Sequence, residues 1–310
     1  MESNMSVLKE FKKAFKESVE GSKPEELVKL SSPHFLYATS EQAISYEKAT
    51  HGSPKYKDNL DFPISNLIRK NATKLTSGLS KSVHFIDLGP GYPSKSLILL
   101  EEFKKSNKIT YYPVDVSPYF LDRAAWTASG RGITTHKQLS RFEDLGPIMD
   151  RELQTVESSR FVFLGLTFNN FEPEFILDIL DGLVENNDRC LICCQSSSGI
   201  SNSDLVAPYD TEAVEEFCFL PLQVLGMDRN CFDFEACFEN NAIRVRFIVN
   251  RNIEYENIPL PEGLKIETSV SYRYETDEME SLISDYFDIS ETFVVDDLAL
   301  YIYLLRGKNI

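Results

Sequence analysis

The sequence predicts an α/β protein in which a doubly wound parallel sheet is interrupted by a smaller α+β unit. From about Val83 onward, short apolar runs alternate with amphipathic segments, a pattern typical of parallel strands joined by helices. After Gln195 a polar run leads into apolar segments of antiparallel character, and a helix with two strands follows at the end. We therefore expect a sheet domain at 61–197 plus 276–310 and a second domain at 1–60 plus 198–275.

The elements of the sheet domain follow from these apolar runs. We expect its strands at 83–88, 109–116, 160–166, 189–194, 287–294 and 299–305. Helices are expected between them at 94–106, 118–129, 173–185 and 277–286. Trp126 falls in the second of these helices and is expected to pack. A terminal pair of strands of this kind often closes a doubly wound sheet.

The remaining segments define the second domain. Leu8, Phe11, Phe15 and Val19 recur at helical spacing and predict an amphipathic helix over 5–20. A further helix is expected at 211–224. Antiparallel strands are expected at 243–250, 264–270 and 271–274, around a turn at 259–263.

Composition excludes several classes of partner. The formal net charge is −16, and no block rich in Lys and Arg stands out, which disfavours nucleic acid and anionic membrane surfaces. No apolar stretch approaches the roughly 20 residues needed to span a bilayer. The amino-terminal helix lacks the pattern of a targeting segment. We therefore expect a cytoplasmic protein that acts on a small molecule.

Cysteine usage argues against a disulfide scaffold or a metal site. The chain has six cysteines, of which Cys190, Cys193 and Cys194 cluster in one apolar run. A second pair of ligands with matching spacing is missing, so a zinc site is not expected. The run instead predicts a buried strand in which cysteine acts as a small hydrophobic residue.

The loop that follows the first strand of the sheet indicates a nucleotide-like ligand. Asp87 ends an apolar run, Gly89 and Gly91 turn the chain, and Lys95 lies in the helix that follows. A dinucleotide fingerprint needs a third glycine, but Ser94 stands there. The Asp-x-Gly-x-Gly form suits S-adenosyl-L-methionine, whose carboxylate would fit the amino-terminal end of the helix beside Lys95.

Polar residues end the next two strands as well. Asp115 lies 24 positions after Gly91, where an acid can accept hydrogen bonds from two ribose hydroxyls or cap the following helix. Asn169 and Asn170 follow the third strand, at the edge where side chains face the ligand crevice. Such an Asn pair can bind a substrate amine and carboxylate, although it can also be a loop or cap.

Several separated segments resemble the histidine-specific N-alpha-methyltransferases, which include the ergothioneine-pathway enzyme and fungal relatives acting on tryptophan derivatives. The matching segments are 86–91, Lys95, 112–117, 163–171, 208–210, 232–234 and 271–274, with looser matches at 35–37, 45–50 and Tyr56. The resemblance implies a class I methyltransferase with a Rossmann-like sheet. It also implies methyl transfer from S-adenosyl-L-methionine to the α-amine of an amino acid or related small amine.

Roles for individual residues are implied by the same resemblance. Tyr37 and Asn170 would be the catalytic residues that orient the amine. The cofactor would be held by Tyr56, Asp87, Gly89, Gly91, Lys95, Asp115, Phe142 and Gly165. The substrate would be bound by Asn170, Tyr209, Ser269 and Ser271. No metal is implied.

Two departures from the family pattern leave the acceptor open. Arg141 stands before Phe142 where the family has an acid, which leaves adenine recognition there uncertain. Ser269 stands where the histidine enzymes have a Glu that reads the imidazole, so histidine specificity is in doubt. Two alternatives remain: a non-catalytic protein that binds S-adenosyl-L-methionine, and an NAD-dependent oxidoreductase, against which the missing third glycine argues.

Overall fold

The structure is a computed structural model that describes residues 2–30, 33–37, 39–52, 54–152, 158–185 and 187–308. The chain divides into two compact units. Unit 1 comprises Met1–Lys57 and Ser201–Tyr272, and unit 2 comprises Asp58–Ile200 and Arg273–Ile310. Each unit has its own hydrophobic core.

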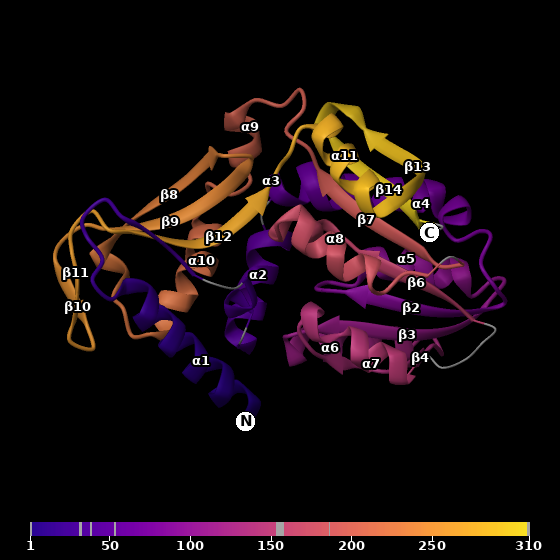
Figure 1. The fold of residues 1–310 in the computed structure, drawn as a ribbon, viewed down its shortest axis with the longest axis horizontal. Coiled ribbons are helices and arrows are strands. Elements are labelled where there is room, and N and C mark those ends of the chain that lie inside the picture. Colours follow the sequence, from indigo (N-terminus) through magenta and orange to yellow (C-terminus); the bar gives the residue numbers. More distant parts are fainter. Residues whose placement is uncertain are drawn as a thin grey trace. The chain divides into compact units, whose positions relative to one another are not determined.

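Unit 2 is built on an eight-stranded, mostly parallel sheet (Figure 1). Its strands are β2 (Ser82–Leu88), β3 (Lys108–Asp115), β4 (Thr134–Thr135), β5 (Gln138–Leu139), β6 (Ser158–Leu164), β7 (Arg189–Gln195), β13 (Phe287–Val295) and β14 (Leu300–Gly307). They are ordered β13-β14-β7-β6-β2-β3-β4, and β5 also pairs with β3. β14 runs antiparallel to both of its neighbours, whereas β2, β3, β6 and β7 are parallel. The predicted doubly wound sheet and its closing strand pair are confirmed.

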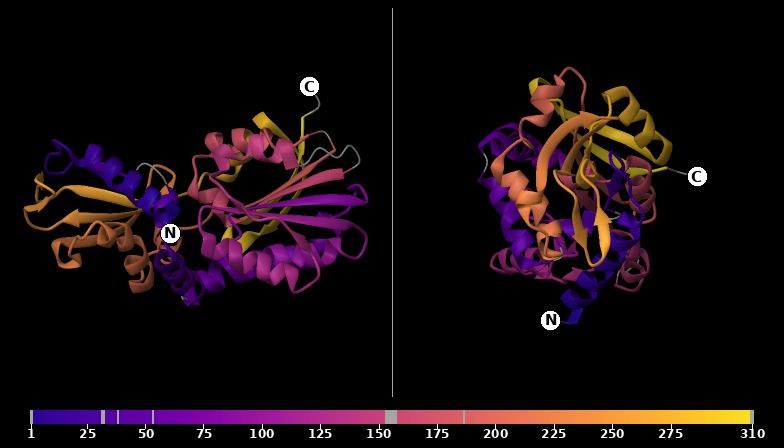
Figure 2. Two further views of the ribbon diagram at one scale, coloured as in Figure 1. Left: turned by 90° about the horizontal axis from the view of Figure 1, so that it is seen from below. Right: turned by 90° about the vertical axis from the view of Figure 1, so that its left-hand side faces the viewer.

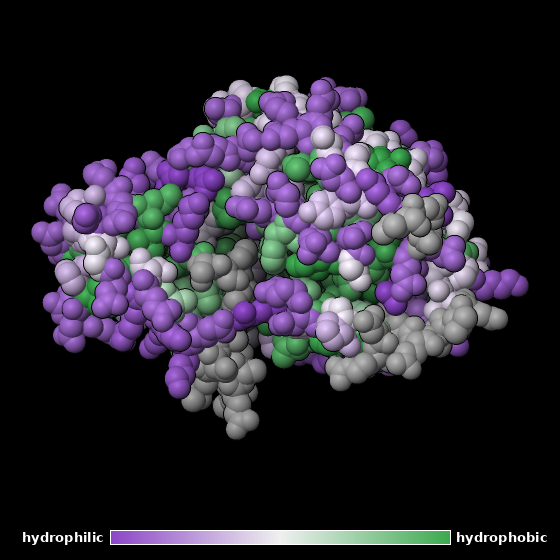
Figure 3. Space-filling view, in the orientation of Figure 1, coloured by the Kyte–Doolittle hydropathy of each residue, from purple (hydrophilic) through white to green (hydrophobic). Residues whose placement is uncertain are grey.

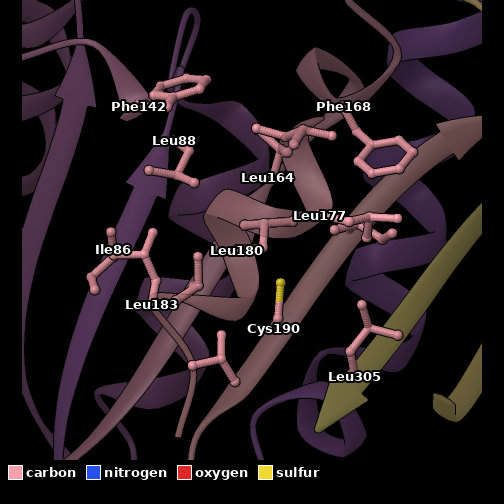
Figure 4. Close-up of a cluster of buried hydrophobic side chains, with 14 of the residues drawn as sticks. Ile86, Leu88, Phe142, Leu164, Phe168, Leu177, Leu180, Leu183, Cys190 and Leu305 are labelled. Carbon is pink, nitrogen blue, oxygen red and sulfur yellow. The ribbon is translucent and has the colours of Figure 1, made fainter. Parts of the chain in front are cut away.

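Helices cover both faces of this sheet (Figure 2). The side chains of Ile86 and Leu88 belong to the core formed with α7 (Gly146–Glu152), α8 (Pro173–Asp181) and α11 (Thr276–Tyr286). Figure 4 shows Leu177 and Leu180 of α8 gathered with strand residues in this core. Because side chains alternate along a strand, Phe85 faces the other side, where its ring lies 6.0 Å from Phe103. The helices that contact the sheet or α5 on that side are α4 (Phe62–Leu75), α5 (Ser94–Phe103) and α6 (Pro118–Ser129).

Unit 1 contains a four-stranded sheet in the order β1-β12-β9-β8 and a separate β10-β11 hairpin. The strands are β1 (Leu27–Lys29), β8 (Phe232–Glu239), β9 (Ala242–Val249), β10 (Ile253–Tyr255), β11 (Ile258–Leu260) and β12 (Lys265–Tyr272). The helices are α1 (Glu2–Val19), α2 (Ser40–His51), α3 (Pro54–Tyr56), α9 (Asn202–Val206) and α10 (Glu212–Val224). Phe11, Phe15 and Val19 of α1 are buried in the core of this unit, as their spacing predicts.

Charged side chains line the other face of the unit 1 sheet. Along β9, Val245 and Phe247 point into the core, while Arg244 and Arg246 alternate with them and are also buried. Both arginines are ion-paired with Glu267 of β12. This pairing explains how two arginines tolerate burial in a strand that reads as apolar on its other face.

Three details of the sequence-based assignment are wrong. Residues 264–270 and 271–274 do not form two strands, because β12 runs unbroken through Lys265–Tyr272 with an irregularity between Glu267 and Ser269. β8 and the β10-β11 hairpin were not predicted as strands. Trp126 does not pack, since 80% of its surface is exposed on α6.

The outer surface seen in Figure 3 is largely hydrophilic, and the clustered cysteines lie in a buried strand. Hydrophilic residues cover much of the face of both units shown in Figure 3. Cys190, Cys193 and Cys194 are free thiols buried in β7, and burial raises the pKa of each. Among the described residues, no cluster of His, Cys, Asp and Glu is arranged to hold a metal. A search of the same residues for a helix long and apolar enough to cross a bilayer found none.

Candidate functional site

The candidate site in unit 2 lies at the edge of the sheet where the strand order reverses. β2 pairs with β3 on one side and with β6 on the other. Leu88 is opposite both Val114 and Leu164, so the three strands end at the same edge. Ligands of open α/β sheets bind outside the carboxyl ends of the strands at such a switch point. Gly89, Asp115 and Gly165 all lie there.

The glycine loop after β2 is shaped by backbone angles that favour glycine. Gly89 has φ +66° and Gly91 has φ +48°, and the Gly89 N–H donates to the Val114 carbonyl at 2.8 Å. A Cβ on Gly89 would lie 3.1 Å from the Thr167 Cγ2 atom. A side chain at position 89 would therefore displace its neighbours. We call the loop from Gly89 to Gly91 the cradle.

Asp87 lies beneath this loop as a buried carboxylate. It is 1% exposed, and the Tyr111 hydroxyl donates to its Oδ2 atom at 2.5 Å. Burial raises the pKa of Asp87 to about 6, although hydrogen bonds from Ser96 and Tyr111 and the charge of Lys95 lower it. Asp87 thus ties β2 to β3 and to the first turn of α5.

Replacing Tyr111 by Phe is expected to destabilise the protein by about 1–3 kcal/mol, because a buried carboxylate loses a donor. The loss is expected to be larger at pH 8 than at pH 5, since Asp87 can bind a proton at the lower pH and then needs no donor for its charge. Urea unfolding at both pH values measures it. Tyr255→Phe is the control, because the buried Tyr255 hydroxyl has no hydrogen-bond partner among the described residues. Equal effects of the two substitutions would contradict the role of Tyr111.

Asp115 ends β3 and is also buried, at 7% exposure. Its Oδ1 atom accepts the Ser117 N–H at 2.9 Å, and burial raises the pKa of Asp115 to about 7. The nearby charge of Asp87 raises it further, whereas backbone hydrogen bonds from Ser117 and Val116 lower it. The N-cap residue of α6 is Ser117, so Asp115 stiffens the turn before this helix and is not its cap.

Two further predicted cofactor residues lie close to the loop. Phe142 begins a 3-10 turn (Phe142–Asp144), and its Cζ atom lies 3.5 Å from the Cβ position of Gly89. Gly165 follows β6, and a Cβ there would lie 3.7 Å from the Lys95 Cε atom. The structure therefore brings Gly89, Phe142, Gly165 and Lys95 to one edge of unit 2.

The two asparagines after β6 have different surroundings. They end the 3-10 turn Leu166–Asn170. Asn169 is 1% exposed; its amide donates to the Gln195 carbonyl at 3.3 Å and accepts the Gln195 N–H at 3.0 Å. Asn169 thus fastens the turn to β7, whereas Asn170 is half-buried and is presented by the turn that Asn169 holds.

The remaining predicted residues belong to unit 1. The Tyr209 hydroxyl donates to Ser271 Oγ at 3.2 Å, and the Tyr209 ring lies 6.4 Å from that of Tyr56. The Tyr37 ring lies 5.3 Å from that of Tyr46 and 5.8 Å from that of Phe217. Ser269 is hydrogen-bonded to the buried Cys218 thiol, which burial leaves with a raised pKa. These groups are aromatic or neutral and polar.

Three residues at the unit 2 edge were not predicted from sequence. Tyr111 and Thr167 contact the loop through the register of β3 and through the turn after β6, which no local motif reveals. Asp61 forms an ion pair with Lys95. For Asp61 we see no signal in the sequence that marks it.

The strand order with antiparallel β14, together with the glycine loop and the acid after β3, defines a class I S-adenosylmethionine-dependent methyltransferase. The chain belongs to the histidine-specific, S-adenosylmethionine-dependent methyltransferase family, whose model matches residues 65–306. A search of curated proteins found no match.

Solved structures share the fold at low sequence identity. The PH0226 protein from Pyrococcus horikoshii OT3 is 13% identical, with 87% of this chain and 100% of that chain covered and a TM-score of 0.51. OxaC is 12% identical over 88% of this chain and 53% of its own, with a TM-score of 0.50.

The residues at the unit 2 edge fit the family's cofactor. Gly89 and Gly91 turn the loop through left-handed backbone, and Lys95 supplies a cation for a carboxylate. The buried hydroxyls of Ser94 and Ser117, at the starts of α5 and α6, have no hydrogen-bond partner among the residues the structure describes. Such unsatisfied groups are costly unless a ligand or water completes them.

Proposed function

We propose that the chain transfers a methyl group from S-adenosyl-L-methionine to the α-amine of an amino acid or a related small amine. Family membership supports the donor. The observation that carries the acceptor is Asn170, a neutral side chain presented at the switch edge by a turn that Asn169 fastens to β7. An amide can orient an amine without trapping it as a charged ion pair, and the attacking amine must be neutral.

We assign cofactor binding and the amine contact of Asn170 to unit 2, and the other acceptor contacts to unit 1. In this assignment Asp87, Gly89, Gly91, Lys95, Asp115, Phe142 and Gly165 hold the cofactor, with Tyr56 covering it. Tyr209 and Ser271, whose hydroxyls are already hydrogen-bonded to each other, bind the acceptor carboxylate. Tyr37 lies in an aromatic cluster and faces the amine.

The chemistry required of these residues is mainly alignment. The bound cofactor supplies a methyl group on an already activated sulfonium, so no strong base is needed. Asn170 and Tyr37 orient the amine lone pair, and water accepts the proton that the amine releases. Excluding bulk water from the neutral aromatic surroundings favours the uncharged amine over its ammonium form.

A mass-spectrometric screen tests this proposal. The protein is incubated with S-adenosyl-L-methionine and a panel of amino acids and biogenic amines, with N-acetylated amino acids as matched controls. We expect methylation of at least one free α-amine and none of its acetylated form. Cofactor binding without transfer to any amine would favour a non-catalytic protein, and transfer only to oxygen or sulfur would overturn the acceptor class.

Ser269 makes histidine one candidate among several for this panel. Its hydroxyl is hydrogen-bonded to the Cys218 thiol, so Ser269 itself offers no carboxylate to an imidazole. We therefore propose that the site does not select an imidazole side chain. A preference for histidine over tryptophan, tyrosine and leucine of about a hundredfold in kcat/KM would contradict this (about 3 kcal/mol).

Asn170→Ala is expected to lower kcat/KM for the acceptor by at least about a hundredfold while leaving cofactor affinity unchanged. The reason is that the amide acts on the amine and not on the cofactor. Steady-state kinetics and calorimetric titration with S-adenosylhomocysteine measure the two quantities. Asn169→Ala is the matched control: it removes buried hydrogen bonds and should cost about 1–3 kcal/mol of stability. Full activity of Asn170→Ala would refute its assignment.

A further inference from the structure

Asp61 and Lys95 form a largely buried ion pair at the edge of unit 2. Asp61 ends the π-helical turn Lys57–Asp61, and Lys95 lies in the first turn of α5. Their side chains are 14% and 16% exposed. In five further ion pairs of unit 2, one side chain is more than half exposed. The pair of Asp61 and Lys95 is thus more buried than these five.

The ion pair of Asp61 and Lys95 lies close to the edge of the sheet where the ligand is expected. The Lys95 Cε atom lies 3.7 Å from the Cβ position of Gly165, the residue that follows β6 at the switch edge. Separating the charges of a largely buried ion pair is unfavourable unless each charge meets another opposite charge. A ligand that brings a carboxylate to Lys95 therefore binds best if it also brings a cation to Asp61.

The cofactor of this family carries such a cation. Its methionine end is a zwitterion, with a carboxylate and an ammonium on the same carbon. Asp87, the other acid near Lys95, is 1% exposed and is already hydrogen-bonded by Tyr111 and Ser96. Asp61 is the more accessible of the two carboxylates and is the one in contact with Lys95.

We propose that Asp61 is a cofactor-binding residue that receives the ammonium of the methionine moiety while Lys95 receives its carboxylate. Each charge at the methionine end of the ligand thereby meets an opposite charge of the protein. The protein is complementary to the zwitterion before it binds. This inference rests on the family's cofactor and not on the proposed acceptor.

The test compares ligands that differ only in the charges of this end. Calorimetric affinities are measured for S-adenosylhomocysteine, for its deaminated analogue that keeps the carboxylate, and for 5′-methylthioadenosine, which has neither group. We expect wild type to prefer S-adenosylhomocysteine over the deaminated analogue by at least about tenfold. Asp61→Asn should lose most of that preference and keep its affinity for 5′-methylthioadenosine.

Two further variants make the result decisive. Asp58→Asn removes an exposed acid from the same turn and should behave as wild type with all three ligands. Asp61→Glu keeps the carboxylate and should retain part of the ammonium preference. The proposal is overturned if Asp61→Asn weakens S-adenosylhomocysteine and the deaminated analogue equally, or leaves both unchanged, or also loses 5′-methylthioadenosine. Failure of wild type to bind S-adenosylhomocysteine would instead overturn the cofactor itself.

Discussion

Asp115→Asn is expected to weaken S-adenosylhomocysteine binding by about a hundredfold or more at pH 8. A carboxylate that accepts two ribose hydroxyls makes two charge-assisted hydrogen bonds, each contributing about 1.5–3 kcal/mol. The carboxyl is buried and its backbone is fixed by the Ser117 N–H, so it is already oriented before a ligand arrives. Calorimetric titration measures the loss directly.

The same residue is expected to make cofactor binding depend on pH. The pKa of Asp115 is raised to about 7 by burial, and ribose hydroxyls favour the charged form. Binding should therefore release a proton near neutral pH and be roughly tenfold weaker at pH 6 than at pH 8. In Asp115→Asn this part of the pH dependence should disappear.

Asp115 affects stability without ligand in the opposite direction: higher pH strengthens cofactor binding but lowers stability. Because the folded pKa of Asp115 lies above its ordinary value of 3.8, the folded state without ligand binds more protons than the unfolded state between pH 4 and pH 7. Its contribution to stability therefore falls as the pH rises through this range. Asp115→Asn is expected to be more stable than wild type at pH 8 in the absence of ligand, with the difference shrinking towards pH 4.

Asp188 provides the matched control for both effects. It is also buried with a raised pKa, and it accepts the Arg160 N–H at 2.6 Å, away from the switch edge. Asp188→Asn should change the pH dependence of unfolding without changing the affinity for S-adenosylhomocysteine. Equal loss of affinity in both variants would show that Asp115 acts through the fold and not on the ligand.

Gly89→Ala is expected to weaken cofactor binding by about a hundredfold and to cost about 1–2 kcal/mol of stability. The stability cost comes from the left-handed backbone, since Gly89 has φ +66°. The loss of binding comes from the methyl group, which would lie 3.1 Å from Thr167 Cγ2 and fill the cradle.

Gly132→Ala separates these two causes. Gly132 has φ +71°, but a Cβ there meets nothing within 4 Å. The variant should therefore show a similar loss in urea unfolding and no loss of cofactor affinity. If both glycine variants bound S-adenosylhomocysteine as wild type does, the cradle would not be the binding site.

The core of unit 2 could be predicted because its signals are local. Parallel strands buried on both faces read as continuous apolar runs, and the loop with Asp87 and Gly89 carries its own motif. β12 was divided wrongly because Thr268, Ser269 and Ser271 interrupt its apolar pattern, close to the irregularity between Glu267 and Ser269. Trp126 was misplaced because helical spacing shows which residues share a face but not always which face is covered.

The candidate site could be predicted only in part, because local sequence patterns do not reveal contacts between distant elements. Asp115 lies directly at a strand end, where the pattern of the sheet determines its position. Asp61 meets Lys95 across 34 positions of sequence, and Tyr111 meets Asp87 only through the pairing of β3 with β2. Contacts between elements depend on register and packing, which periodicity alone does not determine.

A structure of the protein with S-adenosylhomocysteine bound would show directly where the cofactor lies. We expect the ribose hydroxyls on the Asp115 carboxylate, the methionine carboxylate on Lys95 and the backbone of the Gly89 loop against the ligand. An adenosine bound away from the switch edge, with Asp115 contacting no ligand atom, would contradict it.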